Sequence, residues 1–203
     1  MTLTGAMHDH GRWAEETRIQ RTPGARFALI GFALSLLAGC GTQQSASQAV
    51  IAAPPGVALP VSARVAVQVA PNAVNTQTVE YRGETWSYPD AQLMQQAALN
   101  VFRQIFTDVG PLESVRAPVI TVRLTPNSTL NPLMNQYYAN PTATVFPGVD
   151  TYTQPIGTYT GSGTSSQMNF TNAGIASAYD AAFRQIGNAM LADSKLLARV
   201  QGK

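Results

Sequence analysis

The nine residues 61-VSARVAVQV-69 set the architecture that the rest of the chain must complete. Every odd position in this stretch is Val or Ala, whereas the even positions carry Ser, Arg, Ala and Gln. Because successive side chains of a strand point to opposite faces, this alternation predicts a strand with one buried face. Such a strand needs a second apolar layer to cover it, and the following segments are candidates for that layer.

Two later segments have the apolar spacing of amphipathic helices. One helix is predicted to begin near Ser87–Asp90, where Pro89 suits a first turn, and to end at Gly110–Pro111. Its apolar stripe is Met94, Ala98, Val101, Phe102, Ile105 and Val109. A second helix is predicted from about Asn172, and a short helix is expected to restart at Asp193–Ser194. The stripe of the second helix is Ile175, Ala178, Tyr179, Ala182, Ile186, Ala189 and Met190.

Residues 126–172 differ from their surroundings, because 47 positions contain one charged residue, Asp150. Asn, Thr, Ser, Gly, Pro and Tyr dominate this segment. Two strands are predicted within it, at 143–146 and 152–159, and a flexible turn is predicted at Gly161–Gly163.

Residues 118–125 alternate as 61–69 do, and residues 78–81 form a shorter candidate strand. Together the elements predict the α+β class. We expect a two-layer sandwich, with two amphipathic helices packed on one face of a mostly antiparallel sheet of four to five strands. The folded domain is assigned to residues 61–203.

The segment before this domain resembles a secretory signal. Residues 1–26 contain four arginines, and residues 27–38, FALIGFALSLLA, contain no charge. A basic start, an apolar middle and small residues at the cut are the parts of a signal peptide, which is predicted at 1–39. The apolar run is shorter than the roughly 20 residues that a spanning helix requires.

The tetrad Leu37, Ala38, Gly39 and Cys40 contains the only cysteine of the chain. It resembles the lipobox of bacterial lipoproteins. The resemblance implies that the chain is cut before Cys40 and that this residue carries acyl chains such as palmitate, each held in the bilayer by about 0.8 kcal/mol per buried CH₂. In lipoproteins an aspartate after the cysteine favours the inner membrane. Gly41 at this position implies the outer membrane, with the domain on the periplasmic face.

Residues 40–60 are expected to be the acylated cysteine and a flexible tether. Small, polar and proline residues fill positions 41–60, and none of them is charged. Twenty such residues have a root-mean-square span of roughly 25 Å and a limit near 70 Å. In outline the predicted protein is similar to small periplasmic lipoproteins of envelope assembly, which implies an accessory role at the membrane.

Composition excludes several kinds of chemistry from the chain after the predicted cut. Both histidines, His8 and His10, lie in the predicted signal peptide, and the one cysteine is the predicted lipid carrier. No Ser-His-Asp or Cys-His catalytic unit and no histidine or cysteine metal site can form without them. Nine basic and eight acidic residues remain, which is no footprint for nucleic acid. We therefore expect no enzyme activity, no cofactor and no metal.

A few polar groups remain as candidates for chemistry. Glu80 and Glu84 flank a turn, and a carboxylate pair can act on a sugar, although two solvated surface residues explain the spacing equally. Asp90 suits the first turn of a helix, where the macrodipole favours an anion. Asp150 fits either a hairpin turn or a contact with a cation or a partner's arginine.

Four tyrosines form the predicted interaction surface: Tyr137, Tyr138, Tyr152 and Tyr159. Tyrosine supplies a large rigid area with a hydrogen-bonding tip, which suits interfaces and sugar faces. The alternative is that these rings pack on the sheet.

Three functions follow from these residues. The first is an outer-membrane lipoprotein, anchored through Cys40, that acts as a non-enzymatic accessory or assembly factor by contacts between residues 126–172 and an envelope protein. The second is a glycan- or lipid-binding module, for peptidoglycan or lipopolysaccharide. The third is a carboxylate hydrolase that uses Glu80 and Glu84.

Overall fold

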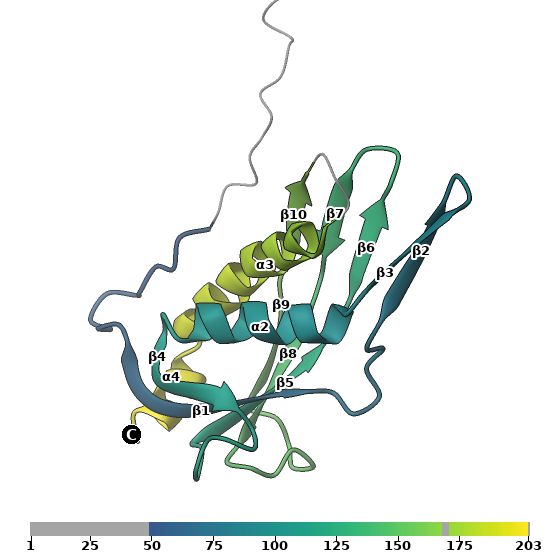
Figure 1. Ribbon diagram of the computed structural model, residues 1–203. Coiled ribbons are helices and arrows are strands. Elements are labelled where there is room, and N and C mark those ends of the chain that lie inside the picture. The colour runs from purple at the N-terminus through teal and green to yellow at the C-terminus, as the bar shows by residue number, and fades with distance from the viewer. Residues whose placement is uncertain (1–48, 168–170, 203) are drawn as a thin grey trace, which may run out of the picture. The chain divides into compact units, whose positions relative to one another are not determined.

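The strand predicted at 61–69 forms as β1, Val61–Val69, the second strand of a five-stranded sheet (Figure 1). The computed structural model describes residues 49–167 and 171–202. The order across the sheet is β4 (Phe106–Pro111), β1, β5 (Ile120–Thr125), β8 (Thr142–Pro147) and β9 (Gly157–Thr160). β1 is parallel to both of its neighbours, whereas β5, β8 and β9 pair antiparallel.

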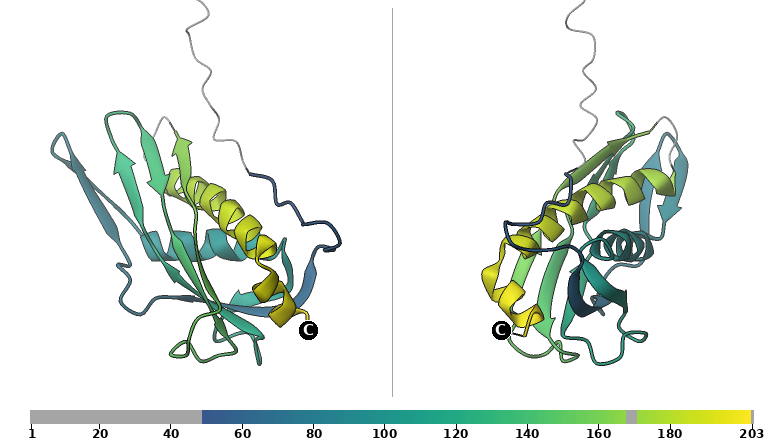
Figure 2. Two further views of the ribbon diagram at one scale, coloured as in Figure 1. Left: turned by 180° about the vertical axis from the view of Figure 1, so that it is seen from behind. Right: turned by 90° about the vertical axis from the view of Figure 1, so that its left-hand side faces the viewer.

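Two helices cover one face of this sheet and supply the second layer (Figure 2). α2, Asp90–Phe102, lies over β1, β4 and β5, and α3, Asn172–Ala192, lies over β9 and the strands beyond it. The helices meet through the rings of Phe102 and Phe183, whose centroids are 5.8 Å apart. The predicted α+β class is confirmed, although the sheet around β1 is parallel and only its other half is antiparallel.

The short predicted helix is α4, Ser194–Val200. It begins where expected, because the Asp193 side chain accepts hydrogen bonds from the backbone N–H groups of Lys195 and Leu196.

The helix predicted from Ser87–Asp90 to Gly110–Pro111 begins at Asp90, within the predicted start, but its predicted end is wrong. Ser87 and Tyr88 belong to β3, Glu84–Tyr88, which pairs with β2, Gln77–Tyr81, in a two-stranded arm that projects from the domain (Figure 1). At the other end α2 stops at Phe102, and the chain turns into β4. The buried positions continue at helical spacing to Ile105, but from Phe106 the backbone is extended because β1 offers it an open edge.

Segment 126–167 holds more strands than predicted. β6 (Ser128–Asn131), β7 (Gln136–Ala139) and β10 (Gly163–Ser166) form a second sheet in the order β10-β7-β6. These strands continue β5, β8 and β9 in the same lateral order. Two backbone hydrogen bonds bridge the break, from Asn140 to Asn127 and from Gly161 to Pro141.

We call this continuous structure the ribbon, composed of residues 120–131, 136–147 and 157–166. Burial alternates along most of the ribbon without a change of face, except that the outward-facing Thr121 and Phe146 are also buried. The inward side chains contact the helices, and the outward ones have no helix over them (Figure 2). The expected strand at 152–159 is shorter than predicted, because residues 148–156 form a loop.

The flexible turn predicted at Gly161–Gly163 is also wrong, because these residues join β9 to β10 and both glycines are buried. A Cβ at Gly161 would lie 2.2 Å from the carbonyl oxygen of Ala182, and one at Gly163 would lie 1.9 Å from that of Ala178. The glycines therefore let the backbone of α3 lie directly on the ribbon.

Gly163→Ala should destabilise the domain by about 1–3 kcal/mol, because the added methyl group meets the α3 backbone rather than a movable side chain. Chemical denaturation of the full chain measures this effect. Thr164→Ala, at the exposed neighbouring position of β10, is the matched control and should change the free energy of unfolding by less than about 0.5 kcal/mol. Equal stabilities of the two variants would contradict the close approach.

Candidate functional site

The outward side of the ribbon is the candidate site, and we call it the ribbon face. Its members are the odd positions 121–131 and the even positions 136–146 and 158–166, which are mostly Thr, Ser, Asn and Gln. Arg123 is the only charged residue in all three ribbon segments. Cross-strand neighbours form hydroxyl rows, one of which is Thr125, Thr142 and Thr160. A second row is Thr129, Tyr138 and Thr164.

Arg123 is held in place at one end of this face. Its guanidinium carbon lies 4.7 Å from the centroid of the Phe146 ring, and its Nη2 donates a 2.7 Å hydrogen bond to the carbonyl oxygen of Thr151. The hydroxyl of Thr121 donates to the carbonyl oxygen of Gly148. The loop 148–156 is thus tied across this end of the ribbon face, while the strands toward β6, β7 and β10 stay open.

The four predicted tyrosines divide by strand parity. Tyr137 and Tyr159 point inward and are 1% and 9% exposed, so the prediction that they belong to an interaction surface is corrected: they are core residues. Tyr138 is half-buried on the ribbon face, where its hydroxyl donates to the Gln136 side chain. Tyr152 is 94% exposed in the loop 148–156.

A buried polar cluster lies beneath the ribbon. Asp90 is fully buried at the start of α2, and its Oδ1 accepts hydrogen bonds from the Ser128 hydroxyl at 2.7 Å and the Tyr179 hydroxyl at 2.8 Å. The Tyr88 hydroxyl lies 3.0 Å from Ser128 Oγ. Sequence reasoning placed Asp90 at a helix start but missed this cluster, because Ser128 is one of many hydroxyl residues in its segment.

Burial raises the pKa of Tyr179 far above its ordinary value, and the negative charge of Asp90 raises it further. Burial also raises the pKa of Tyr88. Burial also raises the pKa of Tyr159. The Tyr159 hydroxyl donates a 2.7 Å hydrogen bond to Asp193, and this bond lowers the pKa of the Asp193 carboxyl group. These hydroxyl groups therefore stay protonated and serve as donors.

The other candidates lie apart from the ribbon face. Glu80 is opposite Thr85 in the arm and Glu84 is opposite Tyr81, so the two glutamates project from opposite faces of the arm and do not form a facing pair. Both line a shallow hollow at the tip of the arm. Asp150 accepts a 2.8 Å hydrogen bond from the backbone N–H of Tyr152. This contact is typical of an aspartate in a turn, which is the first of the two roles considered for Asp150.

A small pocket of about 60 Å³ lies where the arm, the ribbon and the start of α3 meet. Its walls include Trp86, Tyr88, Leu130 and Ile175, and the edge of buried Tyr137. Sequence reasoning did not find it, because its walls come from elements far apart in the chain.

The predicted lipobox, Leu37 to Cys40, lies outside the described residues. Among residues 49–167 and 171–202, no cluster of three or more acidic, His or Cys side chains is placed to hold a metal ion. In the same part of the chain no helix combines the length and apolar character needed to cross a membrane.

No protein-family model matches the chain, and no curated protein matches its sequence. The chain has partial similarity to solved structures, among them the following two. A protein of Xanthomonas campestris from the family DUF330 is 13% identical, with a TM-score of 0.45, and the match covers 74% of this chain and 93% of that one. A candidate lipoprotein of Caulobacter crescentus CB15 is 12% identical, with a TM-score of 0.34 and coverage of 68% and 90%. At these identities the likeness concerns only the course of the chain.

The raised tyrosine pKa values predict a loss of stability in alkali. Above about pH 10 these phenols ionise in the unfolded chain but stay protonated in the folded one, so the unfolded state releases more protons and the free energy of unfolding falls as pH rises. Where this phenol is fully ionised in the unfolded chain, Tyr179 alone lowers the free energy of unfolding by about 1.4 kcal/mol per pH unit.

Tyr179→Phe should flatten this dependence between pH 9.5 and 11.5, measured by chemical denaturation at several pH values. The exposed Tyr152→Phe is the matched control and should leave the slope unchanged. A slope that Tyr179→Phe does not alter would show that this hydroxyl does not titrate differently in the folded state.

Proposed function

We propose that this protein is a bacterial envelope lipoprotein, anchored through acyl chains on Cys40, whose domain is a non-enzymatic accessory factor that docks on an envelope protein through the ribbon face. The observation that carries the proposal is an open face on three long strands whose segments contain a single charge. Charged residues are depleted and tyrosine is enriched at the centres of protein interfaces, and Tyr138 lies in the middle of one hydroxyl row.

The construction beneath the face supports a docking role. The inward side of the ribbon packs on α3, and the buried Asp90 cluster ties β6 to both helices. A rigid support reduces the conformational entropy that the face loses when a partner binds. Less of the free energy of its polar contacts is then offset on binding.

The anchor is proposed from the sequence Leu37 to Cys40, and the outer membrane from Gly41 after the cysteine. Several acyl chains on one residue attach a folded domain stably to a membrane without a spanning helix. The signal peptide at 1–39 and the periplasmic location belong to the same proposal.

A second candidate function is binding of a glycan, and the hydroxyl rows favour it. Thr, Asn and Gln side chains both donate and accept hydrogen bonds, which suits the hydroxyl groups of an uncharged sugar chain. Lipid binding has less support, since the open part of the ribbon face carries Tyr138 as its single large apolar group.

Cys40→Ala should abolish acylation and leave the protein as an uncut precursor. Metabolic labelling with a fatty acid and fractionation of the two membranes measure both effects. Gly41→Asp is the matched variant, and it should keep the acyl chains but shift the protein toward the inner membrane. Normal processing and membrane attachment of Cys40→Ala would contradict the anchor.

Two changes on the ribbon face, Tyr138→Ala and Thr158→Lys, should each reduce recovery of a crosslinked partner from solubilised membranes by about tenfold, because they remove an anchor ring or place a charge in the interface. Thr85→Lys puts the same charge on an exposed position of the arm and is the control.

The same variants separate the two candidate functions. Loss of a stoichiometric protein supports docking, whereas loss of co-sedimentation with purified cell-wall sacculi supports the glycan-binding alternative. Retention of all binding by both ribbon variants would contradict a role for this face.

A further inference from the structure

Residues 49–59 belong to the predicted tether, but residues 50–52 are bound to α3 and parts of 57–59 pack against the core. The Asn188 side chain holds residues 50–52 with two hydrogen bonds: its Nδ2 donates to the carbonyl oxygen of Val50 at 3.0 Å, and its Oδ1 accepts from the backbone N–H of Ala52 at 2.9 Å. An amide side chain thus pairs with the backbone on both sides of Ile51. We call residues 49–59 the strap.

Apolar contacts hold the same segment. Ile51, Val57 and Leu59 are partly buried and pack against the core. A Cβ at Gly187 would lie 2.4 Å from Ile105 Cδ1 and 3.4 Å from Ile51 Cδ1, so this glycine makes room for both side chains on α3. Just after the strap, the N–H of Val61, the first residue of β1, donates a hydrogen bond to the carbonyl oxygen of Ile105.

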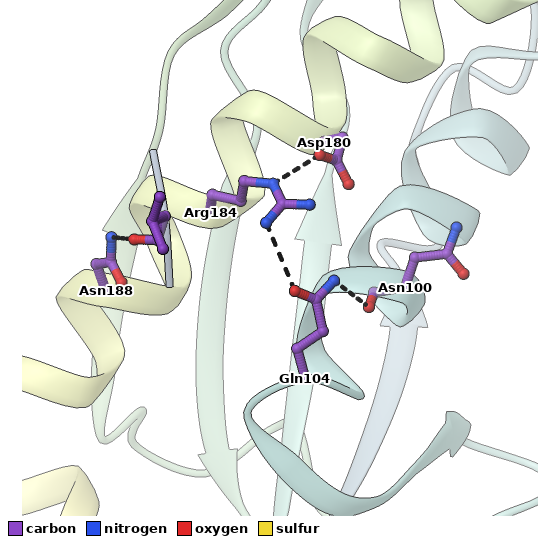
Figure 3. A network of polar contacts seen from close by, with 6 residues as sticks. Asn100, Gln104, Asp180, Arg184 and Asn188 are labelled. Carbon is purple, nitrogen blue, oxygen red and sulfur yellow. Dashed lines mark hydrogen bonds and ion pairs between the residues drawn. The ribbon is translucent and has the colours of Figure 1, made fainter. Parts of the chain in front are cut away.

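The part of α3 that holds the strap is also linked to the turn that follows α2, where Gln104 donates a hydrogen bond to the Asn100 carbonyl oxygen of α2. Arg184 pairs with Asp180 at 2.8 Å, and its Nη1 donates a 3.5 Å hydrogen bond to Gln104 Oε1 (Figure 3). Asn188 follows Arg184 one turn later on α3. The strap is therefore attached to a helix pair that is fixed relative to the ribbon.

From these contacts we infer that the strap is an orienting device, which fixes the point where the anchored chain leaves the domain on its helix side. This inference rests on the proposed acylation of Cys40. Nine residues separate Cys40 from Val50, so the free length is at most about 35 Å, half of what a 20-residue tether would allow. The helix side then faces the anchoring membrane, and the ribbon face is turned toward the aqueous compartment.

The strap itself is tested without reference to the membrane. Hydrogen exchange of the Ala52 amide in the full-length Cys40→Ala protein should become about five to ten times faster on Asn188→Ala, because the amide loses its acceptor. Gln185→Ala is the control on the same helix, since Gln185 binds Ser162 instead, and it should leave this amide unchanged. If the Ala52 amide exchanges without protection in the parent protein, the attachment of the strap to α3 is overturned.

Orientation is tested with the acylated protein in lipid nanodiscs. A fluorophore is placed either at Ala189→Cys, exposed beside the strap, or at Thr158→Cys, exposed on the ribbon face, with Cys40 blocked by its acyl chains. A lipid-borne quencher should quench the first position at least twice as strongly as the second, and Asn188→Ala should bring the two closer together. Equal quenching with a protected Ala52 amide would overturn the orienting role, whereas failure of acylation would count against the proposed function alone.

Discussion

A buried aspartate that hydroxyl groups hold in place constrains the whole domain. Asp90 lies at the first residue of α2, and its described hydrogen-bond donors come from β6 and α3, which are 38 and 89 residues further along the chain. A buried polar group is costly unless it has hydrogen-bond partners, so these hydroxyl groups must stay in place for α2 to keep its position. The two helices and the ribbon are therefore linked by the Asp90 cluster as well as by apolar packing.

The ribbon then separates two tasks by the pleat of its strands. Inward positions are small or apolar and include two glycines that allow α3 to approach its backbone. Outward positions carry hydroxyl and amide groups that the fold does not need for its core. Because one strand contributes alternately to both faces, Tyr137 supports the interior while its neighbour Tyr138 stays available on the outside.

The sequence predicted the elements whose apolar contrast is strong. β1, the start of α3 and the α4 cap are where periodicity and side-chain chemistry placed them. The helix at 87–110 was extended too far because Ile105 keeps helical spacing with Phe102, although the backbone there turns toward β4. The spacing of apolar residues predicts which positions are buried. It does not predict that the edge of β1 is free to pair with the residues after Ile105.

The ribbon was only partly predictable for a related reason. Its inward positions include Ser128, Ala139 and Gly163, which give little apolar contrast against outward threonines, so β6, β7 and β10 were missed. Gly161 and Gly163 resemble turn residues in sequence but serve a close backbone contact. The pocket and the Asp90 cluster depend on contacts between distant segments, and no local pattern contains them.

The scarcity of charge on the ribbon face also has a kinetic consequence. Without a long-range electrostatic field, a partner meets this surface by undirected diffusion, at about 10⁵–10⁶ M⁻¹s⁻¹, and the rate changes little with ionic strength. Attachment to a membrane compensates for the missing electrostatic attraction. A domain on a short tether stays in a thin layer next to the membrane, and there the effective concentration of a membrane-bound partner is high. Recognition of this kind is governed by where the two molecules reside and how long they stay together.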